Sequence, residues 1–324
     1  MLGSFCDRVA TTDLSERSAT FCQFNAALNG HPLLDCFAGD RFEPLKGRDF
    51  DRIVCNPPFV ITPIGELKYH ANALELDDFC RQLIQEVPGY LREGGYCQML
   101  CEWVQLPDQP WQDRLAGWFE GLGCDVWVML ANTQFPETYV RTRALDAELS
   151  EQEQGSRQEG WLAYLQERNV RAIHGGILTI RRRSGDRHWL RVDELEDNVT
   201  RPIGEEMLEI IAAEDFLGRA ISVEELLETR MKVSSSTKLE QQSSWAGAGW
   251  EPTSAVLRTS HGLTAPLAVD GAVLSFLGNC QGSATLREHL VSFAQSVNVA
   301  PDAVQGDFLG MAQELIRRGL LVPA

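Results

Sequence analysis

The sequence predicts an α/β chain in which a doubly wound, mostly parallel sheet is followed by a mainly helical, winged-helix-like domain. The sheet is predicted because short apolar strands alternate with helical patterns, separated by turn residues, up to about residue 187. The helical domain is predicted because the chain ends in three helical segments and one short strand.

The composition is that of a globular protein. Of the 324 residues, 44 % are hydrophobic and 23 % charged, and the length suits one large domain plus a smaller one. The net charge is −17, whereas a protein that grips nucleic acid mainly through phosphates is usually basic. The charge therefore disfavours a long duplex as ligand, but it is compatible with a small basic patch or with a partner that brings the substrate.

No apolar run is long enough to span a bilayer, and the first residues lack the order of a signal peptide. We therefore expect a cytoplasmic protein without a membrane partner. The nine cysteines include no C-x-x-C pair, and His70, His174, His188 and His261 show no metal-ligand spacing. Reduced and mostly buried thiols, surface histidines and no metal site are expected.

The sheet domain is predicted element by element from its apolar patterns. Ser15 can cap the first helix, and Gly94-Gly95 ends a later one. We expect the last two strands to form an edge hairpin, decorated by the polar insert Asn132–Gly160 as a surface excursion. The predicted strands are Arg8–Leu14, Leu33–Ala38, Phe50–Cys55, Tyr96–Val104, Asp125–Leu130 and Gly176–Arg181, and the predicted helices are Ser15–Asn29, Asp77–Leu91, Trp111–Leu122 and Gly160–Asn169.

The pattern changes in the second half. Asp193–Leu217 is acidic and helical, and Met231–Gly249 is rich in Ser, Gln and Gly, which is typical of a linker or loop. The final pattern resembles a winged helix, with helices over Gly271–Leu277, Ala284–Val297 and Ala303–Arg318 and a strand over Leu320–Val322. We expect residues 1–190 to form the sheet domain, 191–265 an acidic connector and linker, and 266–324 the winged-helix-like module.

The strongest chemical signal is Asn56-Pro57-Pro58-Phe59, directly after the apolar strand Phe50–Cys55. A ring amine or an amide nitrogen is a poor nucleophile because its lone pair is delocalised. The Asn56 side-chain oxygen and the Pro57 carbonyl can accept its two N–H groups at a fixed angle, which favours a tetrahedral nitrogen. The prolines fix the backbone, and Pro58 and Phe59 can contact a flat substrate. A plain Pro-Pro turn is the alternative, and the preceding strand favours the chemical role.

Two acidic residues follow the first two predicted strands. Asp13, with Leu14 beside it, is placed to bond the ribose hydroxyls of a nucleoside, and a helix N-terminal charge is the alternative. Asp40 can accept from an adenine amino group, with Arg41 and the ring of Phe42 framing the base, and a Gly-Asp turn is the alternative. The order of the motifs favours a nucleoside cofactor.

Together these motifs resemble the class I S-adenosylmethionine-dependent methyltransferases of the methyltransferase small domain family, over about residues 8–183. Pro58-Phe59-Val60-Ile61 and Cys101-Glu102-Trp103 also match one two-domain bacterial subgroup. The resemblance implies a Rossmann-like fold and S-adenosylmethionine as cofactor. It implies catalytic roles at the target nitrogen for Asn56 and Pro57, substrate contacts for Pro58 and Phe59, the ribose for Asp13, the adenine for Asp40, and further cofactor contacts for Leu14, Arg41, Phe42 and Asn56.

The chain departs from the family at its start. The family begins this domain with a strand and a glycine-rich loop under the methionine moiety, and no G-x-G follows an early strand here. That strand is the centre of the family's sheet, so we expect the strands beginning at Arg8 and Asp51 to lack their shared neighbour. We expect a truncated gene model or a fragment, whose own affinity for S-adenosylmethionine is weak or absent.

The resemblance leads to one main hypothesis and two alternatives. The main one is an N-methyltransferase acting on an exocyclic amino group of a nucleobase, because Phe59 favours a base. The base is adenine or guanine in rRNA, tRNA or DNA, with RNA favoured over DNA. The first alternative is methylation of a glutamine amide in a protein, whose enzymes more often carry Tyr at that place. The second is a truncated, non-catalytic methyltransferase-fold module.

Weaker signals remain outside these motifs. A basic stretch could touch RNA phosphates, and a charged edge strand explains it equally well; it comprises Arg168, Arg171, Arg181, Arg182, Arg183, Arg187 and Arg191. The acidic C-terminal helices favour packing or partner binding. Four tryptophans are expected in the core or in cleft walls: Trp103, Trp111, Trp118 and Trp127.

Overall fold

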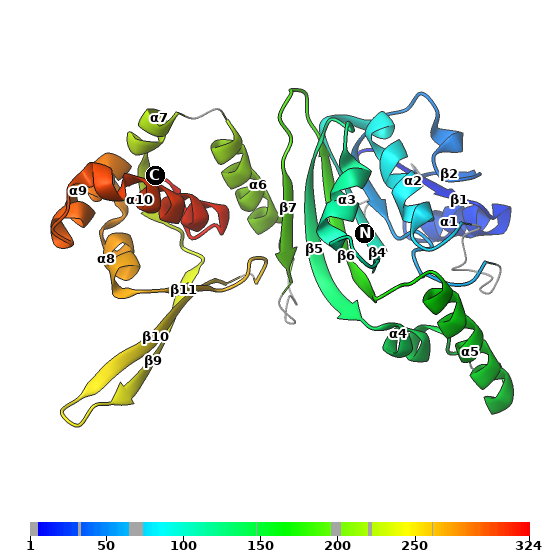
Figure 1. Ribbon diagram of the computed structural model, residues 1–324. Helices are drawn as coiled ribbons and strands as arrows, with labels where there is room; N and C mark the ends of the chain where they lie inside the picture. The colour runs from blue at the N-terminus through cyan, green and yellow to red at the C-terminus, as the bar shows by residue number, and fades with distance from the viewer. Residues whose placement is uncertain are drawn as a thin grey trace. The chain divides into compact units, whose positions relative to one another are not determined.

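The computed structural model describes residues 6–31, 34–64, 74–146, 148–195, 202–219, 222–260 and 262–324, and they form two compact units (Figure 1). The first unit consists of Met1–Val126 and Thr133–Asp186, and the second of Trp127–Asn132 and Arg187–Ala324. His70 and His261 lie outside the described residues. Within those residues, no helix is both long and apolar enough to cross a membrane, and no cluster of three metal-ligating side chains occurs.

A five-stranded mixed sheet runs through the predicted sheet domain. Its strands lie in the order β3 (Phe50–Cys55), β4 (Leu91–Gln105), β6 (Ala172–Arg182), β5 (Cys124–Gln134) and β7 (Leu190–Glu194). β4 runs parallel to β3 and antiparallel to β6. The last two predicted strands, β5 and β6, are neighbours, but their predicted position at the edge of the sheet is wrong, because β7 lies outside β5.

The first two strands form a separate sheet. β1 (Val9–Asp13) pairs only with β2 (Leu34–Ala38), in parallel, and α1 (Glu16–Leu28) connects them with the predicted Ser15 cap, which accepts a hydrogen bond from the Ser18 N–H. In the described part of the chain, β3 has a strand neighbour on one side only. β1 and β3 therefore lack a shared neighbour, as expected.

Close backbone approach at Gly95 joins β4 to β3. A Cβ atom at Gly95 would lie 2.9 Å from the Phe50 carbonyl oxygen, so only glycine fits there. This approach lies inside β4, which begins at Leu91 rather than at the predicted Tyr96. The preceding helix is correspondingly short, and it divides into α2 (Asp78–Glu86) and the single turn η3 (Val87–Tyr90).

The polar insert is not a surface excursion. It folds into α4 (Pro136–Arg143) and α5 (Glu151–Glu167), and α5 begins nine residues before the predicted Gly160 because Ser150 and Glu153 form a capping box. Both helices are polar on one face only, and their buried side chains join the loop after β3 in one apolar cluster. The cluster contains Val60, Ile61, Val104, Tyr139, Val140, Ala144, Trp161, Tyr164, Leu165, Val170 and Ile173.

The predicted burial of tryptophans and cysteines is largely met. All four tryptophans singled out from the sequence are buried, and Trp111 begins α3 (Trp111–Phe119). All nine cysteines are free thiols, and five of them are buried: Cys80, Cys97, Cys101, Cys124 and Cys280.

Most arginines of the basic stretch have partners within the protein, and their contact with RNA phosphates stays a prediction. Arg181 and Arg183 donate to the carboxylate of Asp125, whose side chain is 0 % exposed. Arg182 donates to two backbone carbonyls, and Arg168 pairs with Glu75 at 2.6 Å. β6, which carries Arg181 and Arg182, lies inside the sheet, so the edge-strand explanation is wrong for these two arginines.

The second unit confirms the predicted helices and terminal strand but not the linker. The helices are α6 (Gly204–Gly218), α7 (Val223–Leu227), α8 (Gly271–Asn279), α9 (Leu286–Ser296) and α10 (Pro301–Arg317). One sheet has the order β12-β8-β13 and the other β11-β10-β9. The strands are β8 (Arg230–Val233), β9 (Thr237–Trp245), β10 (Trp250–Thr259), β11 (Leu267–Val269), β12 (Gln281–Thr285) and β13 (Leu321–Pro323).

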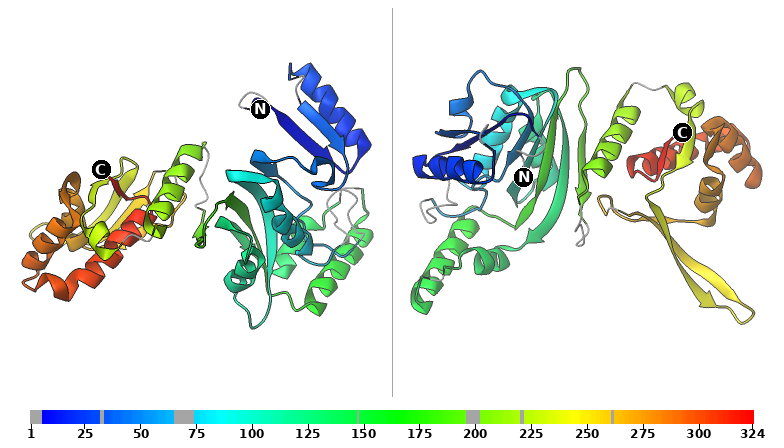
Figure 2. Two further views of the ribbon diagram at one scale, coloured as in Figure 1. Left: turned by 90° about the horizontal axis from the view of Figure 1, so that it is seen from above. Right: turned by 180° about the vertical axis from the view of Figure 1, so that it is seen from behind.

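The predicted linker is therefore two strands. β8 is the central strand of its sheet, and β9 forms a long hairpin with β10 that extends from the unit (Figure 2). β9 looked like a linker because nearly all of its residues are exposed and polar, and the pairing with β10 makes it a strand. Trp245 and Trp250 face each other at the hairpin end, 61 % and 70 % exposed.

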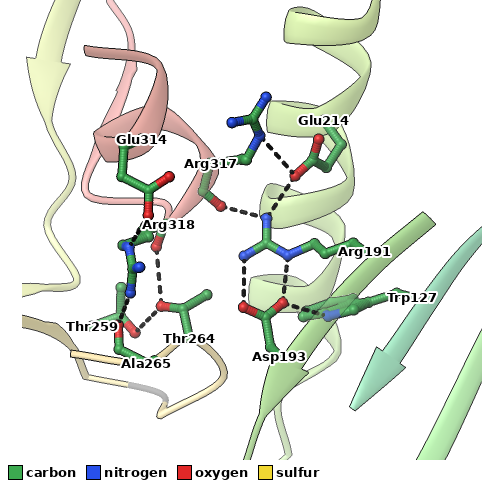
Figure 3. Close-up of polar contacts among 10 residues, drawn as sticks. All are labelled: Trp127, Arg191, Asp193, Glu214, Thr259, Thr264, Ala265, Glu314, Arg317 and Arg318. Carbon is green, nitrogen blue, oxygen red and sulfur yellow. Dashed lines mark hydrogen bonds and ion pairs between the residues drawn. The ribbon is translucent and has the colours of Figure 1, made fainter. Parts of the chain in front are cut away.

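An arginine cluster ties β7 to the helices of the second unit (Figure 3). The Arg191 guanidinium, 9 % exposed, donates to Asp193, to Glu214 at 2.9 Å and to the Arg317 carbonyl at 2.5 Å. The Trp127 indole N–H also donates to Asp193, at 2.8 Å. This arginine of the basic stretch therefore serves the packing of α6 and α10.

The buried Asp125 site generates a stability prediction. Asp125→Ala leaves Arg181 and Arg183 without their shared carboxylate, so the free energy of unfolding should fall by about 3–5 kcal/mol. Asp49→Ala, which removes an exposed partner of Arg92, should cost less than about 1 kcal/mol. Urea unfolding followed by tryptophan fluorescence measures both losses of free energy. Equal losses would contradict the role of Asp125 as the buried partner of Arg181 and Arg183.

His174 was expected at the surface, and it is instead buried on β6. Its ring lies against Trp103 and Trp111, with centroids 6.0 and 5.0 Å away, and its Nδ1 lies 2.8 Å from the Thr133 hydroxyl. Burial lowers the pKa of His174 from 6.5 to about 4, so the ring is neutral in the folded protein at neutral pH.

A pH dependence of stability follows. The unfolded chain binds a proton at His174 below its ordinary pKa while the folded chain does not, so stability is present above 6.5 and is lost as the pH falls towards 4. The loss from this residue should reach about 1 kcal/mol at pH 5.5 and about 3 kcal/mol at pH 4. Urea unfolding gives the free energy of unfolding at each pH. In His174→Gln this free energy should fall less between pH 5.5 and pH 4 than in the unaltered chain, and an equal fall would rule out His174 as the source.

Candidate functional site

The predicted acceptor tetrapeptide lies at the carboxyl end of β3. Asn56 is exposed, Pro57 is buried, and Pro58 and Phe59 are partly buried. The Phe59 N–H donates to the Pro57 carbonyl at 2.8 Å, which closes a tight turn. A carbonyl oxygen has two lone pairs, so the Pro57 carbonyl keeps one beyond its hydrogen bond from Phe59, and the preceding residue, Asn56, is exposed.

The loop after the tetrapeptide is held by α4. The Ile61 N–H donates to the Tyr139 hydroxyl at 2.8 Å, and that hydroxyl donates to Glu102 Oε2 at 2.5 Å. Arg143 donates to the other oxygen of Glu102 at 2.5 Å, and its guanidinium lies 6.0 Å from the Phe59 ring centroid. Glu102 is 4 % exposed, Tyr139 1 % and Ile61 0 %, so this network is shielded from water.

Burial sets the protonation of this network. It raises the pKa of the Glu102 carboxyl, and the hydrogen bond from Tyr139 and the charge of Arg143 oppose that rise. Burial, then the charge of Glu102, raises the pKa of the Tyr139 hydroxyl well above its usual range. Tyr139 therefore stays a neutral donor to Glu102.

The chain is anchored again where it returns towards α2. The Leu76 N–H donates to the Tyr164 hydroxyl of α5 at 3.0 Å. Asp77 accepts from the Val104 N–H at 2.9 Å and from both terminal nitrogens of Arg114 at 2.6 Å. Tyr139 of α4 and Tyr164 of α5 thus each accept a hydrogen bond from a backbone N–H of the segment between β3 and α2.

The predicted cofactor residues lie at the ends of β1 and β2. Asp13 is exposed, and the Gly39 N–H donates to its carbonyl at 2.9 Å, which places Asp13 and Asp40 at neighbouring strand ends. The Asp13 carboxylate accepts from the Ser15 N–H at 2.8 Å, so it serves the helix start as well. The Asp40 side chain is 54 % exposed, and Leu14 is 78 % exposed.

Arg41 and Phe42 have structural contacts. Arg41, with a φ of +46°, donates to Glu86 of α2 at 2.5 Å. Phe42 is 8 % exposed and stacks on Tyr90 with ring centroids 4.5 Å apart. These contacts attach the small β1–β2 sheet to the rest of the first unit, and the Phe42 face towards Tyr90 is already covered. An open depression of about 370 Å³ adjoins them, lined by Asp40, Arg41, Glu43, Lys46, Glu86 and Tyr90.

Sequence comparison assigns the first unit. Residues 3–119 match the family described as methyltransferase small domain, which covers β1 to α3 and every predicted site residue. This part of the chain is a methyltransferase small domain. Residues 209–323 match a second family, described as a domain of unknown function (DUF7782). The cofactor that belongs with the methyltransferase domain is S-adenosylmethionine, as the sequence motifs implied.

Two curated relatives resemble the methyltransferase domain. A ribosomal RNA small subunit methyltransferase C of Alcanivorax borkumensis is 32 % identical over 106 residues, covering 33 % of this chain and 29 % of the relative. A release factor glutamine methyltransferase of Xylella fastidiosa is 31 % identical over 114 residues, covering 31 % of this chain and 42 % of the relative. The matched segments thus span less than half the length of either relative.

Solved structures are similar at lower identity. A methyltransferase from Pyrococcus furiosus has 16 % identity and a TM-score of 0.28, covering 55 % of this chain and 64 % of that one. The [4+2]-cyclase SpnF has 14 % identity and a TM-score of 0.32, covering 57 % and 70 %.

The described residues fit part of S-adenosylmethionine. Asp13 and Asp40 are exposed carboxylates at adjacent strand ends, the arrangement that suits a ribose and an amino group of a base. In the described chain, no G-x-G loop follows an early strand to approach the methionine moiety. No strand of the described chain pairs with both β1 and β3. The described residues therefore include candidates for the nucleoside half of the cofactor and none for its methionine half.

Sequence reasoning missed the residues that hold the acceptor loop. Glu102 was noted only as part of a family match, Tyr139 fell in the predicted surface excursion, and Tyr164 lay in the predicted helix Gly160–Asn169 without an assigned role. One signal was available: Pro136 at a helix start, followed by Tyr139 and Val140, is the spacing of a helix with a buried face. The partners of the two tyrosines, Glu102 and the N–H groups of Ile61 and Leu76, are distant in the sequence, so no local pattern predicts these contacts.

Calorimetry tests the fit of the cofactor. Because the contacts to the methionine moiety are missing in the described chain, the 324-residue chain should bind S-adenosylmethionine more weakly than about 100 μM. Asp13→Ala should weaken any measured binding further, and Asp35→Ala, an exposed carboxylate on β2 paired with Arg48, should not. Low-micromolar affinity of the unaltered chain would show that the described residues suffice.

Proposed function

We propose that this domain transfers the methyl group of S-adenosylmethionine to an exocyclic amino group of a nucleobase, in RNA rather than DNA. The observation that carries the proposal is the acceptor pair: an exposed Asn56 amide and the Pro57 carbonyl, in a turn fixed by two prolines. The match to the methyltransferase small domain and the rRNA relative support it.

The acceptor pair has a clear chemical task. Asn56 Oδ1 accepts one N–H of the amine and the free lone pair of the Pro57 carbonyl accepts the other, which turns the nitrogen lone pair out of the ring plane. Phe59, partly exposed beside them, offers a ring face to the flat base. The sulfonium supplies an activated methyl group when it is bound, so the domain's own part is to bind and orient the nitrogen.

A glutamine amide in a protein is the second candidate. Its nitrogen is planar too and suits the same two acceptors, and the release factor glutamine methyltransferase is as similar in sequence as the rRNA relative. The net charge of −17 favours a substrate without a phosphate backbone. Phe59, which is partly buried, offers an aromatic ring and favours the base.

The acceptor classes are separated by one assay. The chain is incubated with tritiated S-adenosylmethionine at millimolar concentration and with naked rRNA, small ribosomal subunits or a purified release factor. Label in an amino group of a base supports the proposal, and label in a glutamine amide supports the second candidate. No label in any acceptor, with binding of the cofactor confirmed, supports a non-catalytic module.

Asn56→Ala tests the acceptor pair directly. It should lower methyl transfer at least about 10²-fold, because one of two preorganised acceptors is lost, and it should leave the dissociation constant of S-adenosylmethionine within about twofold. Gln105→Ala serves as a control at a β4 amide that donates to the Leu106 and Gln109 carbonyls and accepts from the Trp111 N–H. Full turnover by Asn56→Ala would remove the assigned role.

A further inference from the structure

We propose that Tyr139, oriented by Glu102, is the positioning residue that holds the acceptor tetrapeptide in its catalytic conformation. The inference rests on the proposed function, because it assigns how Asn56 and Pro57 are kept in place. Tyr139 lies on α4, in the segment that follows β5, and touches neither acceptor group itself.

The Tyr139 hydroxyl is committed in both directions. It accepts from the Ile61 N–H at 2.8 Å and donates to Glu102 Oε2 at 2.5 Å, so its hydrogen has one place to go. The direction follows from Ile61, because a backbone N–H can only donate and the hydroxyl hydrogen is then directed to Glu102. Arg143 supplies the opposite charge on the other carboxylate oxygen at 2.5 Å.

Ile61 lies five residues after Asn56, and the intervening backbone is stiff. Pro57 and Pro58 have fixed φ angles, and the Phe59 N–H is bonded back to the Pro57 carbonyl at 2.8 Å. A displacement at Ile61 is therefore carried to the acceptor pair and is not absorbed on the way. A misplacement of about 1 Å at reacting groups can lower a rate about 10²-fold.

Arg143 links the same network to the substrate side. Its guanidinium pairs with Glu102 and lies 6.0 Å from the ring centroids of both Phe59 and Tyr139. The Arg143 side chain is 37 % exposed while that of Glu102 is 5 % exposed, so one end of the pair is buried and the other meets solvent beside Phe59. The network thus holds the backbone of the loop at Ile61 and places Arg143 next to the Phe59 ring.

A merely structural role is distinguished by a matched tyrosine. Tyr164 on α5 also accepts from a backbone N–H, that of Leu76 at 3.0 Å, and it is 8 % exposed against 1 % for Tyr139. Both tyrosines belong to the same apolar cluster. Removal of either hydroxyl leaves one backbone N–H without its acceptor, but only Ile61 is joined to the acceptor pair by the rigid turn.

The test compares Tyr139→Phe with Tyr164→Phe in the full chain. Tyr139→Phe should raise hydrogen exchange of the Ile61 amide, measured by NMR, about 10- to 100-fold, because its buried hydrogen bond is lost. It should lower kcat about 10²-fold and leave the KM for S-adenosylmethionine within about twofold. Tyr164→Phe should change exchange at Leu76 and leave kcat within about threefold.

Glu102 variants keep the test open if Tyr139→Phe folds poorly. Glu102→Gln keeps an oxygen that can accept from Tyr139, so it should retain most Ile61 protection and part of kcat, whereas Glu102→Ala should lose both. Unchanged Ile61 exchange in Tyr139→Phe overturns the proposal, as does an equal loss of kcat in Tyr139→Phe and Tyr164→Phe. If the unaltered chain labels no acceptor, the proposed function fails, and Ile61 exchange by itself still decides whether Tyr139 holds the loop.

Discussion

The hydrogen bond between Tyr139 and Glu102 joins the three elements on which the acceptor half of the site depends. Glu102 lies on β4 inside the sheet, Tyr139 on α4, and the hydroxyl between them takes the Ile61 N–H of the loop after β3. A buried carboxylate is costly without partners, so the fold stabilises it with Tyr139 and Arg143. The same network holds the loop after β3, because the Tyr139 hydroxyl accepts from the Ile61 N–H.

The two halves of the methyltransferase domain are built differently. The acceptor half rests on hydrogen bonds between β3, β4 and β6 and on the apolar cluster under α4 and α5. The half that carries Asp13 and Asp40 is a separate two-stranded sheet, attached through Arg41 to Glu86 and through the stack of Phe42 on Tyr90. Arg41 and Phe42, which were predicted to frame a base, therefore connect the two halves. Asp40, the predicted adenine contact, directly precedes them in the chain.

Local signals predicted much of this fold. β3 was predicted at its observed bounds, and the Ser15 cap, α1 and the C-terminal helices were found because caps and apolar spacing act over a few residues. The β9–β10 hairpin was missed because an exposed polar strand has the composition of a linker, and its conformation comes from its neighbour. The acceptor motif was visible in four letters, but its support was not, since Glu102 and Tyr139 are 37 positions apart and meet only in the folded chain.

The fate of the arginines bears on what the domain can recognise. Arg181 and Arg183 pair with Asp125, Arg168 pairs with Glu75, and Arg191 pairs with Asp193 and Glu214, so each of these cations already has an acidic partner within the protein. In a chain of net charge −17, a nucleic-acid substrate gains little from counterion release. If the proposed function holds, recognition depends on the base itself, at Asn56, Pro57 and Phe59, more than on the phosphate backbone. A flipped or single-stranded base suits such a site better than a duplex, because its amino group can reach both acceptors without a backbone grip.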